Sequence, residues 1–140
     1  MANATYNETD DRTNNSVYST ITPNHLCKIW ATYQLPASLS RWKIGGGVTT
    51  QSASHSTGTV TQINRTTGEV IAFGVPLAFS QKDYALVDAL LEYQISESLT
   101  GTLNVKNIFD KTYYATTGTS SWGNFNGEPR NWMVTLNGKF

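Results

Sequence analysis

Five segments of the chain alternate apolar and polar residues with a period of two, which is the pattern of a strand with one apolar face. In one of them Ile29, Ala31 and Tyr33 alternate with Trp30 and Thr32. The alternation predicts five long amphipathic strands, and residues 1–10 resemble the end of another strand. The five predicted strands are residues 25–35, 41–51, 84–95, 99–106 and 131–140.

Residues 84–95 allow a second interpretation. Leu86, Val87, Leu90 and Leu91 also form a stripe at helical spacing. A strand is favoured because all six odd positions of the segment are apolar and its neighbours are predicted strands. If the segment were a helix, the fold would be mixed α+β instead of all-β.

The connections between these strands alternate between short and long. Residues 36–40 and 96–98 are short turns, whereas residues 11–24, 52–83 and 115–129 are long polar loops. Strands of 11 or 12 residues, tilted by about 45°, cross roughly 25–28 Å. Both features are typical of the wall of an outer-membrane β-barrel. Aromatic residues near the predicted strand ends fit its interfacial girdles, and they are Tyr33, Trp42, Tyr93, Trp132 and Phe140.

The charge and composition exclude several other classes of protein. Ten basic and ten acidic residues give zero net charge, and only 14% of residues are charged. The chain therefore lacks the clustered Lys and Arg of a nucleic-acid-binding protein. Its longest nearly apolar run, residues 70–79, is too short for a membrane-spanning helix, which needs about 20 residues. The first residues show neither the basic cluster nor the apolar core of a signal peptide, and the single cysteine excludes an internal disulfide.

Five strands and a remnant cannot close a barrel on their own. The smallest bacterial barrels have about eight strands, and an open sheet edge in hydrocarbon leaves backbone groups unpaired at several kcal/mol each. The predicted sheet must therefore be part of a longer chain, part of an assembly, or a relic.

Three motifs resemble the TonB-dependent outer-membrane receptors, in their ferric-siderophore branch. The first is TPNHLCKIWATYQLP at residues 22–36, which is similar to a strand of that family that begins at a surface loop. The second is LNVKNIFDKTYY at residues 103–114, which is similar to the family's C-terminal signature. The third is GEPRN at residues 127–131, followed by a last strand that ends in an aromatic residue. The resemblance extends over nearly the whole chain.

The resemblance implies that residues 1–140 are the last strands of a 22-stranded barrel with a plugged lumen. Short turns would be periplasmic and long loops extracellular, in the outer membrane of a Gram-negative bacterium. The family imports a ferric siderophore with energy that the TonB complex relays to an N-terminal plug domain. We expect this chain to lack the plug and not to transport alone.

The same resemblance implies that the barrel assembly machinery recognises the last strand. Its outward residues would be Trp132, Val134, Leu136 and Phe140, and Gly138 departs from the larger residue that the family more often has.

The last long loop offers candidate ligand contacts. Trp122 and Phe125 could cover the flat apolar face of a siderophore, and the alternative for them is loop packing or interfacial anchoring. Arg130 could bind an anionic group of the ligand or form a structural ion pair with Asp88 or Glu92.

No other cluster predicts a site. We expect Asn104, Asn107 and Asp110 to form hydrogen bonds within the barrel wall instead of coordinating a metal. His25 and Cys27 share the outward face and are too few ligands for zinc. No nucleophile and base are paired, so we expect no enzyme activity, no cofactor and no metal site.

Two other classes remain open at this stage. One is a small secreted β-sandwich that binds a carbohydrate-type ligand through Trp122 and Phe125. The other is a small barrel closed by several copies of the chain.

Overall fold

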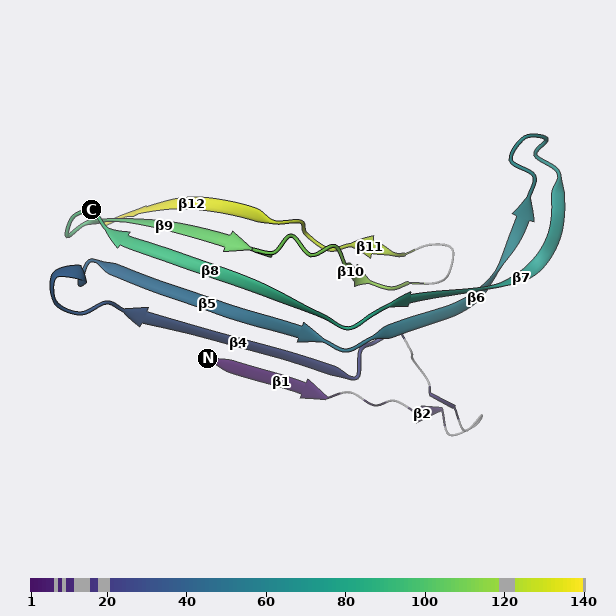
Figure 1. The fold of residues 1–140 in the computed structure, drawn as a ribbon, viewed down its shortest axis with the longest axis horizontal. Helices are drawn as coiled ribbons and strands as arrows, with labels where there is room; N and C mark the ends of the chain where they lie inside the picture. The colour runs from purple at the N-terminus through teal and green to yellow at the C-terminus, as the bar shows by residue number, and fades with distance from the viewer. Residues whose placement is uncertain (7, 9, 12–15, 18–20, 119–122, 140) are drawn as a thin grey trace.

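The computed structural model describes residues 1–6, 8, 10–11, 16–17, 21–118 and 123–139. Six strands form one antiparallel sheet (Figure 1). In spatial order they are β1 (Ala2–Tyr6), β4 (His25–Gln34), β5 (Trp42–Gln51), β8 (Tyr84–Gln94), β9 (Leu99–Lys106) and β12 (Asn131–Gly138). Three smaller strand pairs lie in the long connections: β2 (Asp10–Asp11) with β3 (Ser16–Val17), β6 (Ser54–Ile63) with β7 (Val70–Gln81), and β10 (Tyr114–Thr116) with β11 (Phe125–Asn126).

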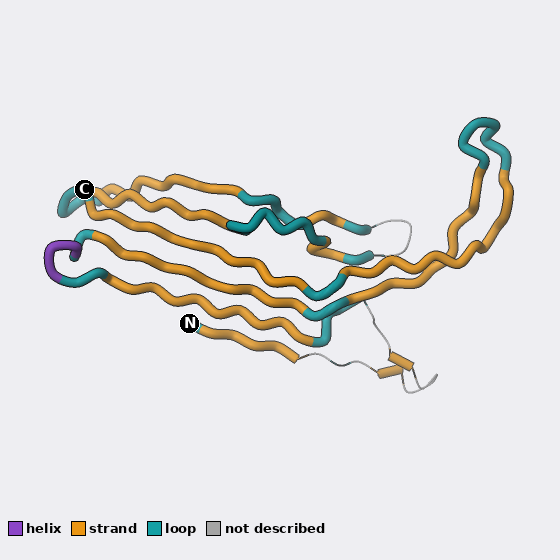
Figure 2. Tube along the Cα trace, viewed as in Figure 1, coloured by secondary structure: helices purple, strands orange, loops and turns teal. Residues whose placement is uncertain are grey.

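All five predicted strands are confirmed, with ends that agree or differ by at most two residues. Residues 84–94 form the extended strand β8, so the α+β alternative is wrong. A single 3-10 turn, η1 (Ala37–Leu39), connects β4 to β5, and a short turn connects β8 to β9. These short turns lie at one end of the sheet and the long connections lie at the other (Figure 2). No helix among the described residues is long and apolar enough to span a membrane.

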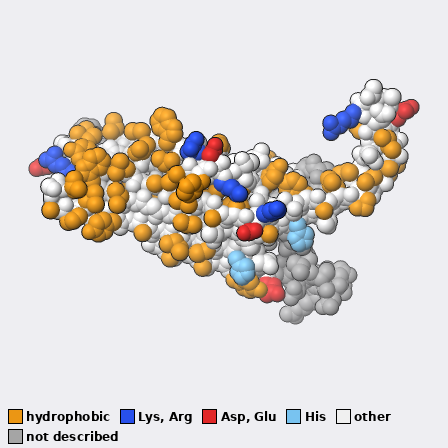
Figure 3. Space-filling model, in the orientation of Figure 1, with side chains coloured by type: hydrophobic (Ala, Val, Ile, Leu, Met, Phe, Trp, Pro, Cys, Tyr) orange, Lys and Arg blue, Asp and Glu red, His pale blue; other side chains and the backbone are white. Residues whose placement is uncertain are grey.

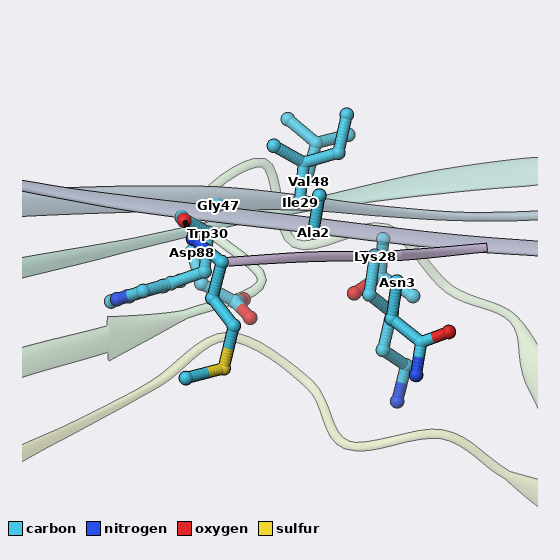
Figure 4. Close-up of a pocket in the computed structure, with 10 residues that line it drawn as sticks. Ala2, Asn3, Lys28, Ile29, Trp30, Gly47, Val48 and Asp88 are labelled. Atoms are coloured by element: carbon cyan, nitrogen blue, oxygen red, sulfur yellow. Dashed lines mark hydrogen bonds between the residues drawn. The ribbon is translucent and has the colours of Figure 1, made fainter.

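The strand register places the apolar residues on one face of the sheet. Ile29 lies opposite Val48, and Val48 lies opposite Val87 on the next strand. A second row joins five strands on the same face, and its members are Tyr33, Ile44, Leu91, Leu103 and Val134. We call this face the outer face and the opposite one the inner face. Figure 4 shows Ile29 and Val48 projecting on one side of the strands, and Lys28, Trp30 and Asp88 on the other.

The inner face is mainly polar. One row across it consists of Gln34, Lys43, Glu92, Thr102 and Thr135. Lys43 Nζ and Glu92 Oε1 form an ion pair at 3.5 Å within this row. The alternation in the sequence therefore separates two chemically different surfaces, as predicted.

The sheet buries almost no hydrophobic core of its own. Among the described residues, Tyr84 is the single buried hydrophobic side chain, whereas Ile29, Tyr33, Val134 and other large apolar side chains of the outer face are exposed. The accessible surface is 10513 Å². A compact monomer of this mass would expose about 7,200 Å². The outer face is therefore a surface that needs an apolar environment, and Figure 3 shows hydrophobic side chains spread over the six-stranded sheet.

Aromatic residues lie towards both ends of the outer face, as the girdle interpretation requires. The Trp42 and Tyr93 rings are 4.4 Å apart near the short turns, and Tyr33 lies in the neighbouring strand. Trp132 is the second residue of β12, at the end with the long connections. Phe140 lies outside the described residues.

Residues 52–83 are not the loop that the composition predicts. Strands β6 and β7 form a long hairpin that continues β5 and β8 beyond the sheet and bends away from it (Figure 1). Its tip is an ordered turn, in which Asn64 Oδ1 accepts the Thr66 N–H at 2.9 Å and Gly68 has a φ of +76°. Both faces of the hairpin are largely solvated, so its residues need not alternate in polarity, and the pattern therefore gave no strand signal.

Candidate functional site

A concavity of about 300 Å³ lies on the inner face, where the strands meet the long connections. We call it the inner hollow. Strands β4, β5, β8 and β9 supply its wall, and the segments around β10 and β12 supply its rim. Its polar and aromatic lining residues include Lys28, Gln51, Tyr84, Asp88, Lys106, Tyr113 and Glu128.

Both signs of charge line the inner hollow. Lys106 Nζ lies 3.6 Å from Glu128 Oε2, and both side chains are mostly exposed. Asp88 Oδ1 accepts the backbone N–H of Asn107 at 2.9 Å. Lys28 projects into the same hollow from β4. An exposed pair of this kind contributes little stability, so these charges remain available to an incoming polar ligand.

Asn107 ties three segments together beneath the rim. Its side chain is 3% exposed, and its Nδ2 donates to the backbone oxygens of Lys111 at 2.9 Å and Glu128 at 3.0 Å. Its Oδ1 accepts the Lys111 N–H at 2.9 Å. The residue has a φ of +50°, a left-handed conformation that Asn adopts more readily than most residues. The segments held are the residue after β9, the residues before β10 and the residues before β12.

Asp110 makes the second connection between the two C-terminal motifs. Its Oδ1 accepts the Arg130 N–H at 2.9 Å, and its own N–H donates to the Asn107 backbone oxygen at 2.8 Å. The hydrogen-bonding role predicted for Asn107 and Asp110 is therefore confirmed. Asn104 lies on the inner face within β9, away from this connection. No group of three or more metal-ligating side chains occurs among the described residues.

Tyr113 is held between an aromatic ring and a glycine. Its ring centroid lies 4.6 Å from that of Tyr84, whose hydroxyl donates to Gln51 Oε1 at 2.9 Å. On its other side the backbone of Gly127 lies so close that a Cβ would overlap the ring. The Gly127 N–H also donates to the Tyr113 backbone oxygen at 2.8 Å. The GEPRN motif thus requires its glycine because a tyrosine of the LNVKNIFDKTYY motif packs against it.

The β10–β11 pair is attached to the base of the β6–β7 hairpin. Gln81 Oε1 accepts the Tyr114 N–H at 2.8 Å, and the Phe79 and Tyr114 rings meet edge to face at 4.7 Å. The buried hydroxyls of Ser54 and Thr117 are 3.2 Å apart. The connection between β5 and β8 and the one between β9 and β12 are therefore joined to each other.

The predicted ligand contacts have different outcomes. Phe125 lies in β11 and is 66% exposed, so its ring is available to a ligand. Trp122 lies outside the described residues. The side chain of Arg130 is in neither of the ion pairs found in the described part of the chain, which join Lys43 to Glu92 and Lys106 to Glu128. Neither of these two ion pairs is the one predicted between Arg130 and Asp88 or Glu92.

Three of the four residues predicted as an assembly signal lie on the outer face of β12, and the fourth, Phe140, lies outside the described residues. Trp132, Val134 and Leu136 are exposed there, opposite Val105, Leu103 and Gly101 of β9. Their arrangement agrees with the alternation, but recognition by the assembly machinery stays a prediction.

Sequence reasoning did not identify the inner hollow itself. Lys28, Gln51 and Tyr84 occupy inward positions of three different strands, and only the strand register shows that they are neighbours. The signal was available in the sequence. In each predicted strand, the inward-facing residues nearest to the long connection include Lys28, Gln51 or Tyr84, so these three residues could have been placed near the same end of the sheet. Tyr113 could not be placed in this way, because it lies outside any strand.

These features define a class of protein. An antiparallel sheet with an apolar outer face and a polar inner face, short turns at one end and long connections at the other, is the wall of an outer-membrane β-barrel.

Comparisons with known proteins identify the family within this class. The chain is 31% identical over 146 residues to the ferric-pyoverdine M114 receptor PbuA of Pseudomonas sp. strain M114, covering 100% of this chain and 16% of that receptor. It is 32% identical over 119 residues to the catecholate siderophore receptor Fiu of Escherichia coli K12, covering 85% of this chain and 14% of that receptor. No family model matches the chain.

A solved structure agrees with these relatives. The ferripyoverdine receptor of the Pseudomonas aeruginosa outer membrane, crystallised with ferripyoverdine, superposes with a TM-score of 0.78 at 30% identity, covering 99% of this chain and 17% of that one. The chain belongs to the TonB-dependent siderophore receptors of the Gram-negative outer membrane, as a segment of their β-barrel. The predicted fold class and location are thus confirmed, and the β-sandwich alternative is not supported. The chain spans 16% of the length of the first of these relatives.

Proposed function

We propose that the chain forms part of the wall and outer mouth of a receptor that takes up a ferric siderophore. The observation that supports this most strongly is the likeness of the whole chain to a segment of a ferric-pyoverdine receptor, together with a polar inner hollow at the end where the long connections meet. The relatives reported above are siderophore receptors.

Within this proposal, Trp122 and Phe125 contact the ligand. Siderophores present flat apolar faces, which aromatic rings cover well. Phe125 is exposed on β11, which pairs with β10 next to Tyr113 of the inner hollow. Arg130 supplies a positive charge for an anionic group of the chelate, because its side chain takes part in no ion pair of the described residues.

The remaining partners follow from the family. Residues 1–140 serve as one partial barrel domain, and the TonB complex acts through a plug domain that these residues do not contain. Lipid surrounds the outer face. The barrel assembly machinery recognises β12 through Trp132, Val134, Leu136 and Phe140. Without a plug, the isolated chain does not transport.

A chimeric receptor tests the proposal. Replacing the matching segment of PbuA with this chain gives a complete receptor, which is expressed in iron-starved cells that lack their own pyoverdine receptor. We expect uptake of radiolabelled ferric pyoverdine. Phe125→Ala should weaken chelate binding by about three- to tenfold, because it removes one aromatic contact.

A matched control is Phe109→Ala. Phe109 is 76% exposed, similar to Phe125, but it lies in the turn after β9 and outside the β10–β11 pair, so its loss should leave chelate binding unchanged. A chimera that assembles in the outer membrane but binds neither ferric pyoverdine nor a ferric catecholate contradicts the proposal.

A further inference from the structure

A second concavity lies at the same level as the inner hollow and shares Gln51 and Tyr84 with it, but it also has outward residues of β4, β5 and β8 in its lining. Its volume is about 440 Å³, and we call it the outer hollow. Thr50 and Ala85 of its lining are paired neighbours on the outer face, and His25 belongs to the same face of β4. Its polar lining residues include His25, Thr50, Gln51, Ser52, Asp83 and Lys111.

The outer hollow marks the border of the apolar surface. The outward row Cys27, Thr50 and Ala85 is the last one across β4, β5 and β8 before the chain enters the long connections. Beyond this row lie His25 and Ser52, which are hydrogen-bonded to each other, and Asp83. Figure 3 shows charged and histidine side chains at this border, between the hydrophobic part of the sheet and the β6–β7 hairpin.

Residues that carry hydrogen-bond donors line the outer hollow from three segments. Lys111 contributes an ammonium group, His25 an imidazole and Thr50 a hydroxyl. The backbone around Lys111 is fixed, because both its N–H and its oxygen bond to the buried side chain of Asn107. His25 is also held, since its N–H donates to Ser52 Oγ at 3.0 Å and its ring lies 5.1 Å from that of Tyr6.

We propose that the outer hollow binds the phosphate group of a lipid in the outer leaflet. In an outer-membrane barrel the end with the long loops faces the outside of the cell, so this border meets the headgroups of that leaflet. An ammonium and an imidazole beside a hydroxyl are suitable donors for a phosphate oxygen. The acyl chains of the same lipid would lie on the apolar rows below, which include Ile29, Val48 and Val87. A lipid fits better than free phosphate because the hollow adjoins this apolar surface.

Asp83 allows the sign of the ligand's charge to be tested. Its carboxylate lines the same hollow and repels a phosphate, so it opposes the attraction of Lys111. For an anionic ligand, Asp83→Asn must strengthen binding and Lys111→Gln must weaken it. For a cation the two effects would be reversed.

The experiment measures retained lipid. The complete PbuA chimera is purified from outer membranes in mild detergent, and phosphorylated lipid bound per receptor is counted by native mass spectrometry. Lys111→Gln combined with His25→Ala should lower the apparent lipid affinity by about tenfold or more, because charge-assisted hydrogen bonds are lost. Lys111→Arg should retain binding, and Asp83→Asn should increase it.

The control is Arg65→Gln, which removes a positive charge at the exposed tip of the β6–β7 hairpin, far from the outer hollow. It should leave lipid retention unchanged. Heat-modifiable migration in gels confirms that each variant is folded. If the double variant fails to fold, Lys111→Gln alone tests the site, because it should still lower lipid retention. The proposal is overturned if the unsubstituted chimera retains no phosphorylated lipid, if inorganic phosphate alone displaces the lipid, if Arg65→Gln lowers retention equally, or if Asp83→Asn weakens it. Ferric siderophore uptake is a separate measurement, so a failure here does not depend on the proposed function.

Discussion

Single residues of the C-terminal motifs owe their identity to contacts between segments that are distant in sequence. Asn107 is buried, has a left-handed backbone and bonds to main-chain groups of both Lys111 and Glu128. An aspartate could not donate to these oxygens, and an aliphatic residue could neither donate nor accept. The asparagine is therefore required by geometry at this one position, and not by ligand chemistry.

Substituting Asn107 should destabilise the folded barrel. Asn107→Ala leaves the Glu128 and Lys111 backbone groups without their partner and places alanine in a left-handed conformation, for a loss of about 2–4 kcal/mol. Asn107→Gly loses the same hydrogen bonds without the backbone strain and should cost about 1 kcal/mol less. Urea unfolding of the chimeric receptor in micelles measures both.

Asn104→Ala is the control for that series. Asn104 lies three residues earlier and faces the inner side of β9, and its side chain makes none of the hydrogen bonds found in the described part of the chain. If Asn107→Ala were as mild as Asn104→Ala, the tie between β9 and β12 would have no energetic importance.

Sequence patterns located the strands well because each strand separates lipid from a polar interior. The alternation in residues 25–35, 41–51 and 84–95 follows from that separation, and it survives tertiary packing. The β6–β7 hairpin has no such separation, so its strands could not be recognised from polarity. Contacts such as Tyr113 with Gly127 depend on how two loops return to the same place, which no local pattern encodes.

The two faces of β12 should respond differently to the same substitution. Val134 lies near the middle of the strand on the outer face, and Thr135 follows it on the inner face. Val134→Arg places a charge in hydrocarbon and should cost about 2–4 kcal/mol, whereas Thr135→Arg remains in the polar interior and should be tolerated. Heat-modifiable migration of the two chimeric receptors provides the comparison, and equal effects would show that the faces are assigned wrongly.

The whole molecule is a sheet with two open edges and one lipid-facing surface. Strands β1 and β12 each have a neighbour on one side only. The exposed area of 10513 Å² is far above that of a compact domain of this mass. Stability of this fold therefore depends on the neighbouring strands of a closed barrel and on surrounding lipid.

The isolated chain should consequently not behave as a soluble domain. Expressed alone, it should accumulate in inclusion bodies and refold poorly even in detergent micelles, because neither edge finds a partner. Size-exclusion chromatography and thermal unfolding after dilution from urea measure this. A monomeric species that unfolds cooperatively without detergent would refute the expectation.

The unequal connections also set an order in time. Between the paired residues Gln94 and Thr100 lie five residues, 95–99, whereas 24 residues, 107–130, lie between Lys106 and Asn131. Closing the longer loop costs about 1.4 kcal/mol more chain entropy. Hairpins with short turns should therefore form first, and β12 should remain unpaired longest. The strand expected to carry the assembly signal is thus the one that remains unpaired, and accessible to the barrel assembly machinery, after the neighbouring hairpins have formed.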